Sequence, residues 1–531
     1  MKNIIEIASP APPRAEAEAP AGPMICQETI GDLTFDASFD SGNAARVEPV
    51  GEEGNEFALW TLRDCEGTPG ENGCRTWFAF SVRGAAPGRT LAFRIHNMNS
   101  QGNLYRHDMR PVYRSLPSKP GWERMTEPAK FWGGKSGDKY REMRENRAYD
   151  ATAAAGDEFV LRFEHLVETP ADETLYFAFC FPYAVTDCAA RLAWLDALYQ
   201  RPTAPVWPPD ATALGSHKQQ QPVGNLSNKD SSAAATPEAA ALSAALAASA
   251  TSADAAAAIA AAAAGAGDAS TSSLAEARLA AAAVALAAGV APLVADGSIY
   301  YHRELLTRSL DGRRLDLITI SSTSGKSSTR DAELSEVRDA GLPTAASEGG
   351  LRAHAFPGKP VFLLTARVHP GETPASHVLD GALKFLLDPA DPRAIALRSQ
   401  FVFKLIPMIN PDGVYRGHYR SDTLGFNLNR VYLAPSAQQH PTVFAITRLV
   451  AELHACGSLQ FYIDCHAHSN KRGCFLFGNA MPDAEAMGQN VTYAKCVEAN
   501  SRWVRAHTKA PARTQRPPRA HTRNALPAPS L

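Results

Sequence analysis

The sequence predicts a β-sandwich followed by an α/β domain with a mixed central sheet. Residues 26–200 contain short β-rich segments separated by Gly, Pro and Asn turns, which is typical of a sandwich. Residues 298–507 alternate continuous apolar runs with helical spacing, which is typical of buried strands covered by helices. A chain of 531 residues with 45% hydrophobic residues has room for both cores.

In the first region, four segments dense in β-branched and aromatic residues predict strands: residues 76–82, 90–95, 158–163 and 175–179. Leu192, Leu195 and Leu198 follow helical spacing. We therefore expect a helix over residues 189–199 that packs against the sandwich.

In the second region, three apolar runs predict strands buried on both faces: residues 360–366, 401–407 and 460–464. Residues 299–301 and 314–320 predict a strand pair, with the turn Asp311-Gly312 between them. Helical periodicity follows at residues 376–387 and 443–454. This alternation of strands and helices favours a mixed or parallel sheet.

Three segments lie outside the predicted cores. Residues 1–25 are rich in Pro, Ala and Glu and predict a disordered leader, and residues 508–531 form a basic Pro/Arg-rich tail. Residues 201–297 are a low-complexity Ala-rich insertion, which we expect to be partly helical and mostly unpacked. Its apolar stretch at 279–294 is shorter than the roughly 20 residues of a spanning helix, so we predict no membrane partner.

Charge and cysteine content exclude some function classes. The net charge is −2, which argues against bulk nucleic-acid binding. The nine cysteines have no paired spacing, which predicts reduced thiols. We interpret Cys65 and Cys74, although close in sequence, as free thiols.

Three residues have the pattern of a zinc site. His369 and Glu372 follow directly after the strand predicted at 360–366, and His466 follows the strand predicted at 460–464. Ligands at the carboxyl ends of neighbouring strands converge at one edge of an open sheet. The local pattern does not choose between His466 and His468, because alternate positions of an extended chain face the same side. Three protein ligands leave one coordination position open, which is typical of catalytic zinc.

Arginines lie between the two metal-binding segments. Arg420 follows the turn Asn410-Pro411-Asp412-Gly413, and Arg430 ends the run Asn427-Leu428-Asn429-Arg430. Beside zinc, one guanidinium can hold a carboxylate through two hydrogen bonds, and another can stabilise charge on a carbonyl oxygen under attack.

These motifs resemble those of the M14 metallocarboxypeptidases, and within them the cytosolic carboxypeptidases that trim glutamate from tubulin. The resemblance rests on His-Pro-Gly-Glu-Thr (369–373), Asn-Pro-Asp-Gly (410–413), Asn-Leu-Asn-Arg (427–430) and Asp-Cys-His-Ala-His (464–468). The β-rich region is similar to the sandwich that precedes the peptidase domain in this subfamily. The resemblance implies His369, Glu372 and His466 as ligands of one Zn²⁺, Arg420 as the carbonyl-polarising residue, and Asn429 and Arg430 as anchors of the terminal carboxylate.

The implied reaction is hydrolysis of a chain-end or branch-point glutamate from acidic protein tails, polyglutamylated tubulin above all. The resemblance also implies a cytoplasmic protein that associates with microtubules. Two other functions stay open. One is a non-catalytic module that binds acidic tails, and the other is a zinc deacylase of small N-acyl amino acids. The sandwich and the Asn429-Arg430 pair count against the deacylase.

The general base is missing from the predicted site. In the resembling family a glutamate on a later strand takes this role. Only Glu485 and Glu498 follow His466, the first in a polar segment and the second in a helix predicted at 493–505. We therefore expect a C-terminally incomplete peptidase domain with low turnover.

Overall fold

The computed structural model describes residues 26–133, 159–199, 298–469, 473–478 and 483–500. The predicted leader (1–25), Ala-rich insertion (201–297) and basic tail (508–531) lie outside the described residues. The chain divides into two compact units, residues 1–467 and 468–531, and each is described by itself. Among the described helices, none has both the length and the apolar character needed to cross a bilayer.

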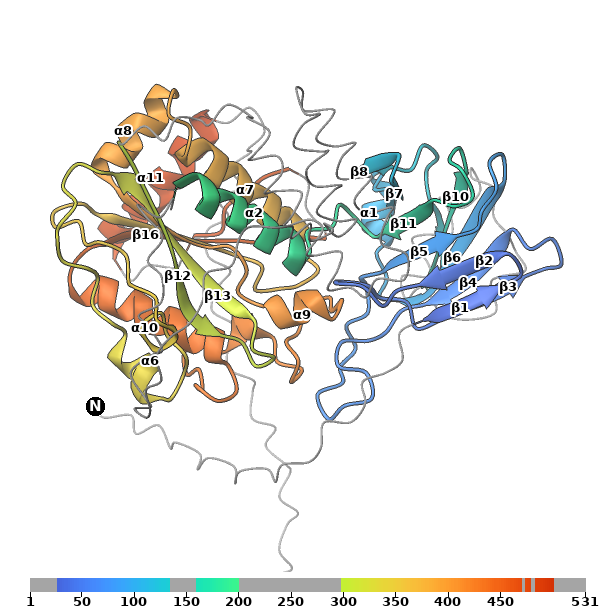
Figure 1. The fold of residues 1–531 in the computed structure, drawn as a ribbon, viewed down its shortest axis with the longest axis horizontal. Helices are drawn as coiled ribbons and strands as arrows, with labels where there is room; N and C mark the ends of the chain where they lie inside the picture. The colour runs from blue at the N-terminus through green and yellow to red at the C-terminus, as the bar shows by residue number, and fades with distance from the viewer. Residues whose placement is uncertain (1–25, 134–158, 200–297, 470–472, 479–482, 501–531) are drawn as a thin grey trace, which may run out of the picture. The chain divides into compact units, whose positions relative to one another are not determined.

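Two sheets form the N-terminal sandwich (Figure 1). The first has the order β1-β2-β5-β11-β7-β8, with bounds Gln27–Ile30, Leu33–Asp36, Ala79–Arg83, Thr174–Ala178, Val112–Leu116 and Lys119–Arg124. The second has the order β3-β4-β6-β10-β9, with bounds Arg46–Val50, Glu56–Trp60, Thr90–Met98, Phe159–Leu166 and Lys130–Trp132. A short helix, α1 (Gly102–Arg106), follows β6.

The sandwich is antiparallel except for one strand pair. Strands β4 and β6 run parallel, because the intervening β5 belongs to the other sheet and the chain returns in its original direction. Aromatic rings fill the space between the sheets. Phe93, for example, has ring centroids of Phe177 and Phe80 at 4.8 and 5.2 Å. Buried ring pairs of this kind stabilise a core beyond their area alone.

The second domain is built on a mixed five-stranded sheet, as predicted. Its order is β12-β13-β15-β14-β16, with bounds Ile299–Arg308, Arg314–Ser322, Val402–Ile406, Val361–Ala366 and Leu459–Cys465. Strand β14 runs parallel to both neighbours, whereas β13 is antiparallel to β12 and β15. Among the described strands, β16 is an edge of this sheet.

Helices cover both faces of the mixed sheet. The longer ones are α7 (Thr373–Leu386), α8 (Pro392–Gln400) and α10 (Pro441–Ala455), and the shorter ones are α6 (Ser335–Asp339), α9 (Pro411–Tyr415), η3 (Ala346–Glu348) and η4 (Leu428–Arg430). Leu379 of α7 packs in one apolar cluster with Ile320, and Leu449 of α10 packs in another with Leu317. Since Leu317 and Ile320 point to opposite faces of β13, this strand is buried on both faces. The edge strand β16 has no fully buried residue, so the prediction that residues 460–464 form a strand buried on both faces is wrong.

The helix predicted at 189–199 is α2 (Val185–Tyr199), which packs against the mixed sheet. Leu192 and Leu195 are buried in a cluster that includes Tyr301 of β12. The predicted packing against the sandwich is therefore wrong. Leucine spacing indicates which face of a helix is buried, but it does not indicate the partner.

Candidate metal centre

The three predicted ligands lie at adjacent strand ends. His369 and Glu372 occupy the connection from β14 to α7, and His466 comes one residue after β16. Strands β14 and β16 are parallel neighbours whose pairing ends at Ala366 and Cys465. The two segments are therefore brought together by sheet register, although 94 residues separate Glu372 from His466.

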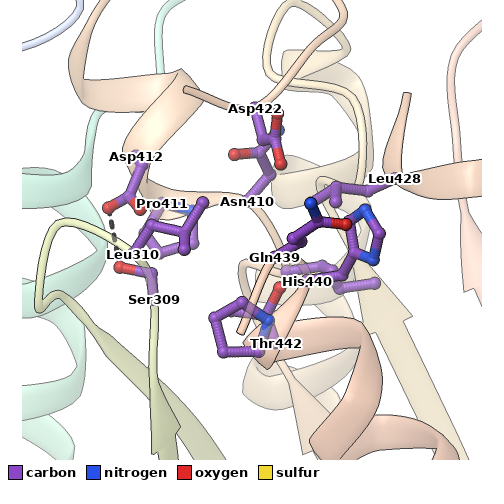
Figure 2. A pocket seen from close by; sticks show the side chains of 12 residues that line it. Ser309, Leu310, Asn410, Pro411, Asp412, Asp422, Leu428, Gln439, His440 and Thr442 are labelled. Atoms are coloured by element: carbon purple, nitrogen blue, oxygen red, sulfur yellow. Dashed lines mark hydrogen bonds between the residues drawn. The ribbon is translucent and has the colours of Figure 1, made fainter. Parts of the chain in front are cut away.

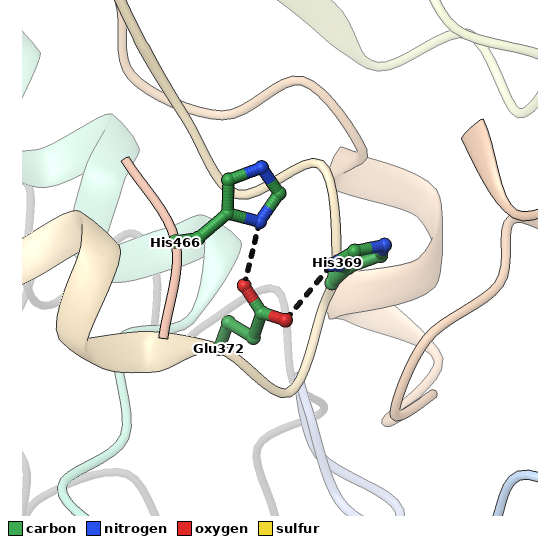
Figure 3. Close-up of side chains that lie close together, drawn as sticks. All are labelled: His369, Glu372 and His466. Carbon is green, nitrogen blue, oxygen red and sulfur yellow. Dashed lines mark hydrogen bonds and ion pairs between the residues drawn. The ribbon is translucent and has the colours of Figure 1, made fainter. Parts of the chain in front are cut away.

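Figure 3 shows the Glu372 carboxylate between the two imidazole rings. Its Oε1 lies 2.8 Å from Nδ1 of His369, and its Oε2 lies 2.9 Å from Nδ1 of His466. One possible ligand atom from each of the three residues lies within 4.8 Å of the other two. Two imidazole nitrogens and one carboxylate are a donor set that suits zinc and leaves a coordination position open. The residues therefore fit the predicted ion.

The charges of the cluster are strongly coupled. Burial would raise the pKa of Glu372, but hydrogen bonds from His369 and His466 outweigh it and lower the pKa to about 2. Burial would lower the pKa of His466, but the carboxylates of Asp464 and Glu372 raise it to about 10. Glu372 also occupies the N-cap position of α7, where the helix dipole favours negative charge. The site is thus an anionic carboxylate surrounded by groups that favour its charged form.

Each histidine has an outer partner on its second ring nitrogen. Nε2 of His369 lies 3.0 Å from Oδ1 of Asn427, and Nε2 of His466 lies 2.7 Å from Oδ2 of Asp464. Both partners are acceptors, so they favour a proton on Nε2 and leave Nδ1 to face the cluster. Such outer contacts fix the orientation of metal-binding histidines. The orienting roles of Asn427 and Asp464 are not among those predicted from the sequence.

The loop between the ligands is held by a buried arginine. Arg367 is 2% exposed and adopts a positive φ of 63°, which is uncommon for a residue with a side chain. Its guanidinium donates to the carbonyl oxygens of Pro370 and Tyr183 at 2.9 and 2.8 Å and to Oγ of Ser376 at 2.9 Å. These hydrogen bonds compensate the backbone strain and fix the path of the chain between His369 and Glu372.

Glycine at position 371 is required by close packing. A Cβ there would come within 3.0 Å of the Tyr419 side chain and backbone oxygen. The Gly371 N–H donates to the carbonyl oxygen of Tyr419 at 2.9 Å. The ligand loop is therefore in direct backbone contact with the loop that carries Arg420.

The remaining predicted site residues lie on two segments near the cluster. Arg420 is next to Tyr419, and Asn429 and Arg430 belong to η4. Oδ1 of Asn427 accepts from the Asn429 N–H at 3.1 Å and also contacts His369. The structure thus connects the backbones of these residues to the metal cluster.

Neither later glutamate is assigned as a general base. Glu485 and Glu498 both lie in α11 (Ala484–Asn500), which belongs to the second compact unit. The helix begins earlier than the predicted residue 493, so Glu485 lies in its first turn. His468 also belongs to this unit and is not part of the metal cluster identified among the described residues. All nine cysteines, Cys65 and Cys74 included, are free thiols.

A separate small cavity lies beside the loop that carries Arg420 (Figure 2). Its volume is about 10 Å³, and it is lined by Asp412, Asp422 and His440 among others. Among the described residues, Oδ2 of Asp422 and Nε2 of His440 have no hydrogen-bond partner. Burial raises the pKa of Asp422 to about 6. The cavity lies outside the metal-binding cluster.

Two families match the chain in order. Residues 35–179 match the cytosolic carboxypeptidase N-terminal domain, and residues 293–470 match the zinc carboxypeptidases of peptidase family M14. The metallo-carboxypeptidase from Burkholderia cenocepacia has a similar fold, with a TM-score of 0.51 at 17% identity, over 90% of this chain and 82% of that chain.

Named relatives are similar over most of the chain. Cytosolic carboxypeptidase-like protein 5 is 31% identical in Rattus norvegicus over 89% of this chain and 56% of the relative. The Homo sapiens protein is 31% identical over 89% of this chain and 52% of the relative. Cytosolic carboxypeptidase 6 of Mus musculus is 28% identical over 90% of this chain and 60% of the relative.

The chain therefore spans little more than half the length of these relatives. Its two matched domains stand in the order that the motifs predict, with the three clustered candidate ligands inside the second match. With both domains present, the chain carries an M14 zinc carboxypeptidase domain preceded by the N-terminal domain of the cytosolic carboxypeptidases.

Proposed function

We propose that the chain is a zinc carboxypeptidase that removes glutamate from acidic protein tails, with polyglutamylated tubulin as the substrate. The observation that carries the proposal is the clustering of His369, Glu372 and His466, with the Nδ1 atom of each imidazole facing the Glu372 carboxylate. The similarity to cytosolic carboxypeptidases supports the reaction class and a cytosolic location. Association with microtubules is part of the proposal. We propose one zinc ion per chain.

The residues of the site have distinct proposed roles. His369, Glu372 and His466 would hold zinc, which supplies Lewis acidity toward a scissile carbonyl and activates water. Arg420 would stabilise the negative charge that develops on the carbonyl oxygen. Asn429 and Arg430 would bind the terminal carboxylate, which selects the last residue of a chain. No described residue is assigned as the general base.

Two other functions share parts of this site. A module that binds acidic tails without cutting them would need the arginines but no turnover. A zinc deacylase of small N-acyl amino acids would need the zinc ligands but neither the sandwich nor a site for a long acidic chain. The match to a cytosolic carboxypeptidase N-terminal domain over residues 35–179 favours the carboxypeptidase over the deacylase.

The test is glutamate release by the purified, zinc-loaded chain. Synthetic peptides ending in several glutamates are the substrates, and the matched peptides with an amidated C-terminus are the controls. A carboxypeptidase releases free glutamate from the first set only, and release stops when zinc is removed. Peptide binding without release would instead support the binding module. Release of acetate from N-acetylglutamate, with no action on peptides, would support the deacylase.

A further inference from the structure

We propose that the sandwich is part of the catalytic apparatus, because its Asp64 positions Arg420. Asp64 is a positioning residue in this proposal, since it acts through the backbone of another segment. The inference rests on the proposed role of Arg420 in stabilising the carbonyl oxygen. It assigns to the N-terminal domain a direct part in the reaction.

The Asp64 carboxylate caps three successive backbone N–H groups of the loop that carries Arg420. Oδ1 accepts from Tyr419 at 2.6 Å, and Oδ2 accepts from Arg420 at 2.8 Å and from Ser421 at 2.7 Å. Asp64 is 1% exposed, so water does not compete for these bonds. A buried carboxylate with three N–H donors forms strong, charge-assisted hydrogen bonds.

Further contacts surround this carboxylate. We call residues 62–75 of the sandwich the clamp loop, and residues 417–425 of the peptidase domain the arginine loop. Nδ2 of Asn72 donates to Oγ of Ser421 at 2.8 Å, and Sγ of Cys65 donates to the carbonyl oxygen of Asp422 at 3.1 Å. The clamp loop therefore contacts the arginine loop through two further side chains that follow Asp64 in the sequence.

Backbone packing makes the contact close. Gly70 of the clamp loop and Gly425 of the arginine loop pack so tightly that a Cβ on either would come within 3.0 Å of the partner backbone. Gly425 also has a positive φ of 85°, which a residue with a side chain rarely adopts. Because both residues are glycines, the main chains of the clamp loop and the arginine loop are in direct contact. This contact restricts the position of the arginine loop.

The arginine loop also contacts residues 369–372, the segment that carries two of the candidate ligands. The carbonyl oxygen of Tyr419 accepts from the Gly371 N–H at 2.9 Å, between the ligands His369 and Glu372. The backbone at Arg420 is therefore held from two sides. Asp64 binds its N–H group, and the loop between His369 and Glu372 binds the neighbouring Tyr419 carbonyl. A guanidinium that stabilises negative charge developing on a substrate oxygen must extend from a backbone that is already fixed in position.

Asp64→Asn tests the proposal with little change of volume. An amide has one oxygen acceptor, so its NH₂ group must face at least one of the three N–H donors. Glu71→Gln is the matched control, because Glu71 lies in the clamp loop and accepts the N–H of Gly67 within the same loop. We expect the control to behave as the unaltered chain.

The measurement is a double-mutant cycle on the full zinc-loaded chain. The probe is a phosphinic analogue of a peptide that ends in two glutamates, because its tetrahedral anion mimics the attacked carbonyl. Its dissociation constant is measured by calorimetry for the unaltered chain, Asp64→Asn, Arg420→Ala and the double variant. We expect Asp64→Asn to weaken binding about tenfold when Arg420 is present and less than about twofold when it is absent. Zinc content stays unchanged.

The outcomes separate the two proposals. If Arg420→Ala leaves binding unchanged, the proposed role of Arg420 fails, and this inference falls with it. If Arg420→Ala weakens binding but Asp64→Asn has no effect, or the same effect in both backgrounds, only the positioning by Asp64 is overturned. Should Asp64→Asn not fold, Asn72→Ala in the same cycle removes the neighbouring contact to Ser421 and is judged by the same criterion.

Discussion

Asp464 and His466 form a carboxylate–imidazole pair, with Oδ2 of Asp464 2.7 Å from Nε2 of His466. The other oxygen of Asp464 accepts from Oγ1 of Thr365 at 2.7 Å, and Thr365 lies on the neighbouring strand β14. The Asp464 carboxylate is therefore held by Thr365 of β14 while it orients the imidazole ring of the candidate ligand His466 at the end of β16. The strands β14 and β16, which bring the candidate ligands together, therefore also fix the orientation of the His466 imidazole ring.

Asp464→Asn should weaken zinc binding about ten- to hundredfold without unfolding the chain, because it removes the charged acceptor that orients His466. Zinc affinity is measured by competition with a chromophoric chelator. Asp391→Asn is the control, since Asp391 caps α8 at the surface and has no part in the cluster. An unchanged zinc affinity for Asp464→Asn would contradict the orienting role.

His466→Ala and Glu372→Gln should each abolish stoichiometric zinc, whereas His468→Ala should retain about one zinc per chain. The reason is that His369, Glu372 and His466 form the cluster, while His468 is not part of it among the described residues. Zinc per chain is measured by elemental analysis after dialysis against a weak chelator. Loss of zinc in His468→Ala alone would show that the other histidine of the motif is the ligand.

The sheet and the clustering of the three candidate ligands could be predicted from sequence because their signals are local. Apolar runs mark β14 and β16, and His369, Glu372 and His466 follow them directly. Asp464 also carries a local signal, since it alternates with His466 along an extended chain and so points to the same side.

Other parts of the site have no such signal. Asn427 contacts His369 across 58 residues, and Asp64 contacts Arg420 across 356 residues. Asn and Asp are common in turns because their side chains bond to the nearby backbone. Their presence in a predicted turn therefore does not indicate a role in a site. Their roles follow from packing between segments, which neither periodicity nor motif spacing encodes. The partner of α2 was not predictable for the same reason.

Arg430→Gln should reduce affinity for a peptide with a free C-terminal carboxylate by about tenfold or more, because a charged two-point contact is lost. The same substitution should leave the weak binding of an amidated peptide unchanged. Calorimetric titration of both peptides gives the ratio of the two affinities. Equal losses for the two peptides would show that Arg430 binds another part of the substrate or supports the fold.

Asp422 should make the unfolding free energy pH-dependent. Burial raises its pKa from 3.8 to about 6, with Asp412 adding repulsion across the cavity. Between pH 4 and 6 the Asp422 carboxyl is largely ionised in the unfolded chain but still protonated in the folded chain. Its contribution to the unfolding free energy is therefore fully present below pH 4 and is lost as the pH rises through 6. His440, whose pKa is lowered by burial, acts in the opposite direction in this window, so the total slope does not isolate Asp422.

The difference between Asp422→Asn and the unaltered chain isolates the carboxyl. Asparagine keeps the oxygen that accepts from the Leu424 and Phe426 N–H groups but does not ionise. We expect the two chains to be about equally stable at pH 4 and the variant to gain on the order of 2 kcal/mol by pH 7. Denaturant unfolding across this range measures the gain. A difference that stays constant with pH would show that Asp422 is ionised throughout and that its burial is compensated by other groups.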